Sequence, residues 1–276
     1  MPKFIYRYKY LPDGDGLRAV IGKRTLKFTH PQKFNDPFDC MPVCEIDLPR
    51  EISKIHPQLR EALHLDGLSA EELHVTLSKA ESGMRVSFES GDFITSLLSG
   101  ASVLSLSKIP DSTLMWSHYA EDHKGAVVEF RIDCSKKFSL GTSHADLICL
   151  DVHYSRERPV MLWDGNPSAP NTVLENLILT KSDVWAYEQE SRVLKSYGGE
   201  GIFKYDPTAL SAVVLGARNE NQEELVALVG AVESSLNQAI PVYQAKFCGR
   251  TYRLNIPGFK YRTDSGVIQS AHPEER

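Results

Sequence analysis

Long apolar runs are missing from this sequence. No stretch approaches the roughly 20 apolar residues that cross a bilayer, and the opening residues, M-P-K-F-I-Y-R-Y-K-Y, lack the apolar core and small-residue cleavage site of a signal peptide. The 276 residues are 42% hydrophobic and 24% charged, as is usual for a soluble globular protein. We therefore expect a cytoplasmic protein that does not associate with a membrane.

Cysteine is scarce, and its spacing does not fit a zinc site. Cys40 and Cys44 are separated by M-P-V, but no second cysteine or histidine pair follows at the spacing that a zinc module needs. An odd, scattered set of thiols is typical of a reducing compartment. We expect all five to be reduced structural thiols: Cys40, Cys44, Cys134, Cys149 and Cys248.

Several catalytic and nucleotide-binding motifs are also missing. There is no G-x-x-x-x-G-K-[ST] loop, no G-x-G-x-x-G after a strand and no G-x-S-x-G elbow. These missing motifs argue against a nucleoside triphosphatase and against a Rossmann-type dinucleotide fold. His118 and His123 are five positions apart, about 140° around a helix, so they do not form an i, i+4 ligand pair. We expect no bound metal.

A strongly basic character is likewise missing from the chain as a whole. The formal net charge is −5, which gives no whole-chain signature of tight nucleic-acid binding. A local basic groove is compatible with this total, so an RNA or DNA acceptor stays open.

The pattern of apolar residues predicts an α+β fold. Strand-like alternation predominates at both ends of the chain, and helical periodicity fills the region between. Ser69 and Glu72 have the spacing of a helix-capping box inside that region. We predict one domain over residues 1–261, with a helical insertion at about 49–99 and a flexible tail at 262–276.

Polar residues near the first strand and a later strand are candidates for a site. Tyr6 and Tyr8 alternate with Arg7, so Arg7 should face the side of the sheet that the tyrosines do not. Ser105 and Ser107 should share one face of their strand by the same period of two. An ordinary surface arginine and a tight sheet crossing are the structural alternatives for these two features.

The stretch W-A-Y-E-Q-E-S-R-V-L-K contains the sharpest candidate. If it is a strand, Glu188 and Glu190 share one face and Arg192 continues it. Adjacent carboxylates repel, so this arrangement costs stability unless a cation or hydroxyl lies nearby. Trp116 and Tyr119 are three apart on an expected helix and could present aromatic surface to a planar ring, although plain core packing is the alternative.

Three boxes in the sequence resemble a large bacterial domain family of unknown function. They are F-N-D-P-F-D at 34–39, M-W-S-H-Y at 115–119 and W-x-Y-E-x-E-x-R at 185–192. The resemblance extends over roughly residues 4–250. It supplies no activity by itself.

The order of features also resembles the ADP-ribosyltransferase superfamily. Members carry an Arg or His on the first strand, a serine-bearing strand that leads into a helix, and a later E-x-E strand; the S-T-S triplet of the superfamily reads S-L-S here. This resemblance implies a split, mixed and mostly antiparallel sheet, with NAD as the substrate. It implies Glu190 and Glu188 as catalytic residues. The implied NAD-binding residues are Arg7, Tyr8, Ser105, Ser107, Trp116, His118 and Tyr119.

The resemblance further implies an intracellular toxin or phage-defence effector. Its acceptor would be a protein, RNA or DNA, and an antitoxin or immunity protein could hold it in check. Two other classes stay open. One is a metal-dependent nuclease using Asp36, Asp39, His118, Asp122 and the two glutamates, and the other is a sensor that binds a nucleotide without turnover.

Overall fold

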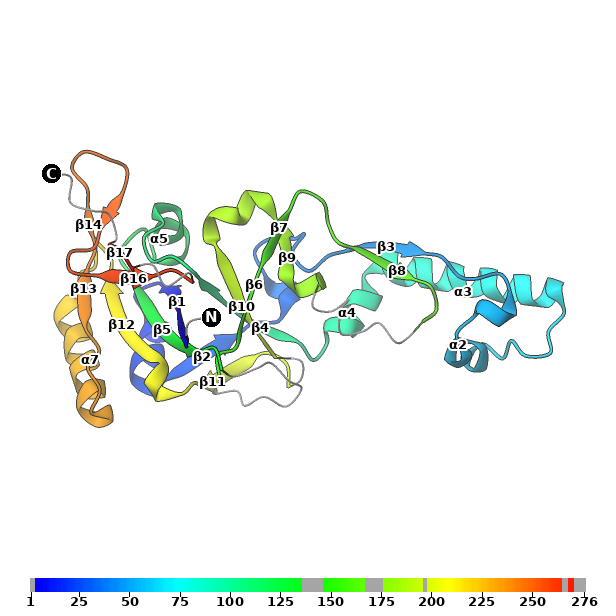
Figure 1. Ribbon diagram of the computed structural model, residues 1–276, viewed down its shortest axis with the longest axis horizontal. Coiled ribbons are helices and arrows are strands. Elements are labelled where there is room, and N and C mark those ends of the chain that lie inside the picture. The colour runs from blue at the N-terminus through cyan, green and yellow to red at the C-terminus, as the bar shows by residue number, and fades with distance from the viewer. Residues whose placement is uncertain (1–2, 136–145, 167–175, 196–197, 265–267, 271–276) are drawn as a thin grey trace. The chain divides into compact units, whose positions relative to one another are not determined.

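The computed structural model describes residues 3–135, 146–166, 176–195, 198–264 and 268–270. The chain forms two compact units (Figure 1). The first, which we call the sheet unit, combines residues 1–29, 101–152 and 184–276. The second, the helical unit, combines residues 30–100 and 153–183. Each unit is thus built from segments that are far apart in the sequence.

The sheet unit contains a seven-stranded sheet with the order β13-β12-β5-β1-β4-β10-β6 (Figure 1). β12 and β13 are parallel, and the other neighbours are antiparallel. This confirms the predicted α+β class and the mixed, mostly antiparallel sheet. The strands are β1 (Phe4–Leu11), β4 (Ser102–Ser107), β5 (Ala126–Asp133), β6 (Cys149–Asp151), β10 (Glu190–Lys195), β12 (Leu210–Leu215) and β13 (Val242–Gln244).

Helices contribute side chains to both sides of this sheet. On one side, Leu104 and Leu106 of β4 belong to a core with α1 (Asp15–Arg18), the π-helix η1 (Ala19–Lys23) and α7 (Gln222–Leu236). We call this side the α7 face. On the other side, the α5 face, Tyr8 and Tyr10 of β1 pack with α5 (Thr113–Tyr119) and with the C-terminal residues Phe259 and Tyr261. Alternation along each strand therefore decides which face a side chain joins.

Three small sheets complete the sheet unit. They pair β2 (Thr25–Phe28) with β11 (Gly201–Lys204), β14 (Lys246–Phe247) with β15 (Leu254–Asn255), and β16 (Lys260–Arg262) with β17 (Ile268–Ser270). A 3-10 helix, η5 (Pro207–Ala209), precedes β12. The β16–β17 pair lies partly in the segment predicted as a flexible tail. Residues 265–267 and 271–276 of the predicted tail lie outside the described residues.

The helical unit contains the whole of the predicted helical region at about 49–99. Ser69 caps α3 and accepts a bond from the Glu72 backbone, while the Glu72 side chain binds back, which confirms the predicted capping box. Leu48, Ile55, Leu65 and Leu77 form its buried core. Its elements are η2 (Pro31–Lys33), β3 (Val43–Ile46), η3 (Ile52–Lys54), α2 (Pro57–Ala62), α3 (Ala70–Ser90), α4 (Asp92–Leu98), β7 (His153–Ser155), β8 (Val160–Trp163) and β9 (Thr180–Ser182).

Two further predictions concern the whole chain. The five cysteines are free thiols, as expected. Within the described part of the chain, no helix combines the length and apolar character that crossing a membrane requires.

Candidate functional site

The register of three neighbouring strands aligns part of the predicted site. Tyr8 of β1 lies opposite Ser107 of β4, and Ser107 lies opposite Glu190 of β10. Directly opposed residues point to the same side of a sheet, so Ser107 and Glu190 lie on the α5 face with Tyr8. Ser105 lies opposite Arg192 on the same face. The prediction that Ser105 and Ser107 share a face is therefore confirmed.

Glu188 is not on the strand, so the predicted strand geometry of the glutamate pair is wrong. A 3-10 helix, η4 (Asp183–Glu188), precedes the strand, and β10 begins only at Glu190. Gln189, between them, has a left-handed backbone with φ of 45°. Ser107 Oγ donates to the Glu188 carbonyl at 2.7 Å and so ties the end of η4 to β4. The alternation rule fails here because it assumes a continuous extended backbone.

Glu190 forms a buried ion pair with Arg192. Arg192 Nε lies 2.9 Å from Glu190 Oε1, and Nη2 lies 3.1 Å from Oε2. Their side chains are 4% and 1% exposed, which removes both charges from water. A bidentate guanidinium–carboxylate contact is both strong and directional. It holds the Glu190 carboxylate in a fixed orientation.

Tyr119 and Lys9 complete the surroundings of the two carboxylates. The Tyr119 hydroxyl donates to Glu188 Oε1 at 2.6 Å. Lys9 of β1 donates from Nζ to the Ser105 carbonyl at 2.9 Å. Burial lowers the pKa of Lys9, and the negative charges of Glu190 and Glu188 partly oppose that decrease. Arg192 thus binds Glu190 and Tyr119 binds Glu188, although Glu188 reaches this position from a helix.

Aromatic rings lie beside Tyr119. His118 is exposed, and its ring centroid lies 6.1 Å from that of Tyr119 and 6.3 Å from that of Tyr187. Trp185 lies 6.1 Å from Tyr187 and is also partly exposed. Sequence reasoning missed Trp185 and Tyr187, although both belong to the W-A-Y-E box. Together these four side chains offer aromatic surface next to Glu188.

Trp116 does not present its ring to a ligand, so that prediction is wrong. Its side chain is 0% exposed, and Nε1 donates to the Pro110 carbonyl at 2.9 Å. Tyr10 packs on it edge to face at 5.6 Å, and His123 stacks on it at 6.2 Å. Trp116 therefore packs in the core, whereas Tyr119, three positions later, binds Glu188.

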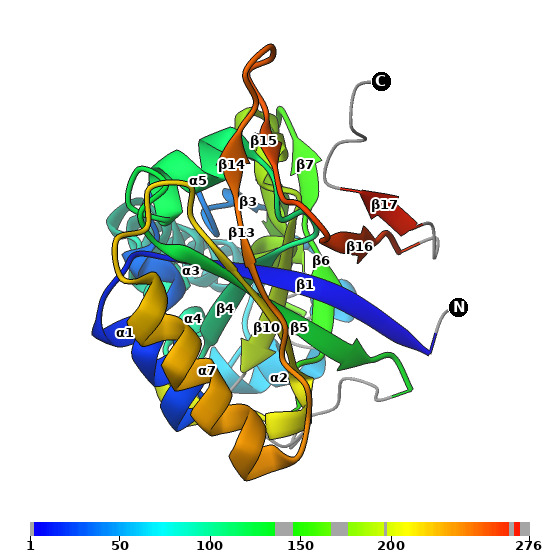
Figure 2. The ribbon, with the colours of Figure 1, turned by 90° about the vertical axis from the view of Figure 1, so that its left-hand side faces the viewer.

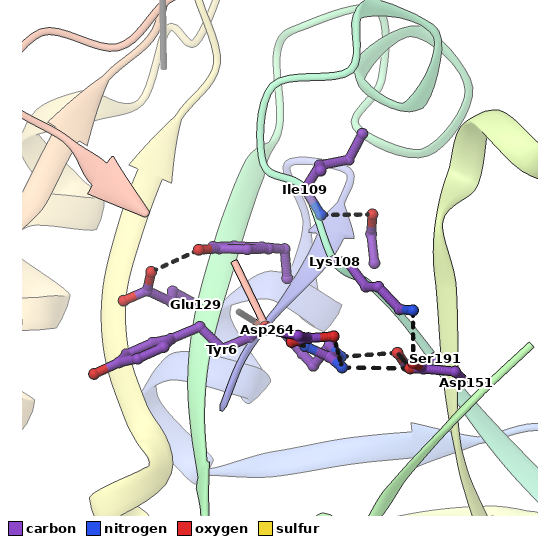
Figure 3. A network of polar contacts seen from close by, with 10 residues as sticks. Tyr6, Lys108, Ile109, Glu129, Asp151, Ser191 and Asp264 are labelled. Atoms are coloured by element: carbon purple, nitrogen blue, oxygen red, sulfur yellow. Dashed lines mark hydrogen bonds and ion pairs between the residues drawn. The ribbon is translucent and has the colours of Figure 1, made fainter. Parts of the chain in front are cut away.

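Arg7 lies on the opposite face of the sheet from Glu190, as its alternation with Tyr8 predicts. It donates from Nε to Ser191 Oγ at 2.8 Å and binds both carboxylate oxygens of Asp264 at 2.7 and 3.0 Å. Asp151 accepts from Arg7 at 3.3 Å and from Lys108 at 2.6 Å (Figure 3). Arg7 is 2% exposed. It therefore belongs to a separate ionic network on the α7 face.

That network determines the charge of Asp151. Burial tends to raise the pKa of this carboxyl, but the hydrogen bonds from Lys108 and Ser191 and the nearby charges of Lys108 and Arg7 outweigh burial, and the pKa is lowered. Asp151 therefore stays ionised as a partner for both cations. No feature of the sequence linked Arg7 to Asp264, which lies 257 positions away.

Tyr8 is a core residue on the α5 face. Its ring is 0% exposed and contacts Phe259 and Tyr261 edge to face, with centroids 6.4 and 6.2 Å away. Its hydroxyl donates to Glu129 at 3.0 Å (Figure 3). Burial, together with the charge of Glu129, raises the pKa of Tyr8. The Tyr8 hydroxyl binds Glu129 and not Glu190, so Tyr8 is not part of the proposed site.

The described residues hold no group of three or more His, Cys, Asp or Glu side chains that could bind a metal ion. The described residues therefore give the nuclease alternative no support.

The model of a family described as "Protein of unknown function (DUF2971)" matches residues 115–193. This confirms the resemblance to a family of unknown function over that segment. The matched residues include the M-W-S-H-Y and W-x-Y-E-x-E-x-R boxes, whereas the F-N-D-P-F-D box at 34–39 lies outside them. Comparisons with curated proteins and with solved structures gave no match.

The bond between Tyr119 and Glu188 leads to a first prediction. Tyr119→Phe keeps the ring but leaves a buried carboxylate oxygen without its phenol donor, so we expect the free energy of unfolding to fall by about 1.5–3 kcal/mol. Urea unfolding measures this loss. Tyr243→Phe is the matched control, because Tyr243 is a partly buried tyrosine whose ring packs on Phe259 at 5.0 Å. Equal losses in both variants would contradict the assigned bond.

His123 follows α5 in a strained turn. Glu121, Asp122 and His123 have φ angles of 50°, 49° and 70°, which non-glycine residues rarely adopt. The His123 ring is 8% exposed, stacks on Trp116, and lies 3.3 Å from Ser117 Oγ through Nε2. Burial lowers its pKa, and the positive charge of Arg218 lowers it further. The folded protein therefore favours neutral His123.

A second prediction follows for the dependence of stability on pH. Below the ordinary pKa of 6.5, His123 is protonated in the unfolded chain but stays neutral in the folded chain. Stability therefore falls as the pH falls from 6.5 toward the lowered pKa of the folded state. Above 6.5 both states are neutral and the contribution vanishes. Urea unfolding at pH 7.5 and 5.5 should show a smaller acid-induced loss in His123→Gln than in the wild type. The exposed His118, changed to Gln, is the control; an unchanged loss in His123→Gln would refute the assignment.

Proposed function

We propose that this chain is an NAD-dependent ADP-ribosyltransferase whose site lies on the α5 face at Glu190 and Glu188. One observation carries the proposal. Two buried glutamates from an E-x-E motif are paired with Arg192 and Tyr119, next to partly exposed aromatic rings. Ionisable groups held in buried surroundings beside a specific charge partner are candidates for functional sites.

Glu190 would stabilise the reacting sugar. Cleavage of the bond between nicotinamide and ribose develops positive charge on the ribose, as in glycoside transfer. A fixed carboxylate stabilises that charge because it needs no reorganisation during the reaction. The contact with Arg192 supplies the fixed orientation, since both Glu190 oxygens are bound by one guanidinium.

Glu188 would act on the acceptor. The glycosidic bond breaks with its electron pair leaving on nicotinamide, and the acceptor nucleophile forms the new bond to the same ribose carbon. The proton that the nucleophile loses passes to Glu188 as a general base. Tyr119 orients this carboxylate through the bond to Oε1.

The NAD-binding roles are revised from the sequence-based ones. Arg7 is bound to Asp264 and Asp151 on the α7 face, so we remove it from the NAD-binding residues. Trp116 is in the core, so we propose His118 and Tyr187 as the rings that stack on nicotinamide. Ser107 would act indirectly, through its bond to the Glu188 carbonyl.

The proposed biological role rests only on the resemblance to the ADP-ribosyltransferase superfamily. We propose an effector of the toxin or phage-defence type, acting in the cytoplasm and held by an antitoxin or immunity protein. A macromolecular acceptor fits a site in which Glu188 takes the proton from the acceptor nucleophile.

Radiolabelled NAD tests the proposal. Purified protein is incubated with NAD labelled in the adenosine moiety, with and without cell lysate, and label transfer to macromolecules is measured. We expect transfer that depends on the protein. Cutting of nucleic acid that requires a divalent metal and no NAD would favour the nuclease, and tight NAD binding without any consumption would favour the sensor.

A further inference from the structure

A long segment of the sheet unit carries positive charge only. Residues 234–263 contain no Asp or Glu, although the whole chain has a net charge of −5. The lysines and arginines in this segment are all exposed. They are Lys246, Arg250, Arg253, Lys260 and Arg262. The acidic chain thus has a local basic region at its C-terminal end.

The β14–β15 hairpin, residues 246–255, adds exposed aromatic rings to this charge. Phe247 is 51% exposed and Tyr252 is 102% exposed. Lys246 precedes Phe247, and Arg253 follows Tyr252, so each ring has a cation beside it in the sequence. The loop between the two strands extends away from the main sheet (Figure 2). The guanidinium of Arg218 also lies over the Phe247 ring, at 5.3 Å from its centroid.

We propose that the β14–β15 hairpin and Arg218 bind single-stranded nucleic acid. Cations contact the phosphates, and flat rings stack on unpaired bases, a combination that proteins use to bind single strands without sequence preference. Exposed Tyr252 at the hairpin tip fits this role because a base can reach the face of the ring. The hairpin offers two aromatic side chains as its exposed apolar surface, which is small for insertion into a lipid surface.

The hairpin is linked to the proposed site through α5. Phe247 contacts the His123 ring with centroids 5.2 Å apart, and His123 stacks on Trp116 of α5. Tyr119 of the same helix donates to Glu188. A nucleic-acid strand bound on the hairpin therefore lies beside α5, the helix that positions Glu188, the proposed general base. That this strand is the acceptor of ADP-ribose, through one of its oxygen or nitrogen nucleophiles, rests on the proposed function.

Fluorescence anisotropy with labelled 20-nucleotide pyrimidine DNA and RNA strands tests the binding, in the absence of NAD. We expect wild-type protein to bind both, with affinity that falls as salt rises. Tyr252→Ala should weaken binding by about 5- to 150-fold, the effect of losing one stacked base. Arg250→Ala should make the slope of log affinity against log salt shallower by about 0.7, as expected when one phosphate contact is lost.

Two exposed residues of β11 serve as matched controls. Ile202→Ala removes an apolar side chain that is 70% exposed, and Lys204→Ala removes an exposed cation. Both should leave the affinity unchanged. The proposal is overturned by absent binding, by equal binding in Tyr252→Ala and the controls, or by binding to anionic phosphatidylserine vesicles that competes with the strands. NAD consumption without strand binding would overturn this inference alone, whereas strand binding without NAD consumption would overturn only the transferase.

Discussion

Arg192→Met is expected to lower the free energy of unfolding by about 3–5 kcal/mol, the usual cost of leaving one member of a buried ion pair without its partner. Glu190 is 4% exposed and both of its oxygens are bound by Arg192. The variant would leave its negative charge buried with Lys9 as the neighbouring cation. Urea unfolding followed by circular dichroism measures the loss.

Two variants show whether this cost belongs to burial of the pair. Glu190→Leu combined with Arg192→Met removes both charges and should recover most of the stability, because an apolar replacement of a buried pair is often neutral. Arg50→Met is the matched control. Arg50 also binds both oxygens of a carboxylate, that of Glu81, at 2.9 and 3.0 Å, but the Arg50 side chain is 53% exposed. A loss in Arg50→Met as large as in Arg192→Met would refute the role of burial.

Glu190→Gln is expected to lower the rate of NAD turnover by about 10²–10³-fold, the typical effect of removing one group that stabilises charge in a transition state. The fall should appear in kcat with little change in KM, because the positive charge on the ribose develops only during the reaction. Initial rates of nicotinamide release over a range of NAD concentrations separate the two constants.

Glu129→Gln controls for the loss of a buried carboxylate as such. Glu129 lies on the same face of the same sheet, is 6% exposed and accepts from Tyr8 at 3.0 Å. Burial raises its pKa, with opposing contributions from hydrogen bonds of Ser211 and Tyr8. This variant should keep wild-type turnover. Turnover that survives in Glu190→Gln would remove Glu190 from the catalytic role.

Local sequence patterns predicted much of the fold and part of the site. The α+β class, the helical region and the capping box at Ser69 follow from periodicity and from a spacing rule, whereas the mixed sheet was implied by the superfamily resemblance. Alternation predicted that Arg7 and Tyr8 lie on opposite faces of the sheet, and that Glu190 and Arg192 share one face. These inferences held because each depends on a backbone that stays regular over a few residues.

The remaining features depend on contacts that periodicity does not encode. The left-handed backbone of Gln189 interrupts the expected strand and moves Glu188 onto η4. Trp116 is drawn into the core by packing against Tyr10 and His123, which helix spacing alone does not reveal. Arg7 pairs with Asp264, which lies 257 positions away. Such long-range pairings are set by tertiary packing.

Release of nicotinamide from NAD by the wild-type protein tests the central claim most directly. The folded protein is incubated with NAD and cell lysate, and free nicotinamide is measured over time against a sample without the protein. The account predicts release that requires the protein, because cleavage at the ribose must free one nicotinamide for each ADP-ribose transferred. NAD that stays intact in the presence of folded protein and lysate would contradict it.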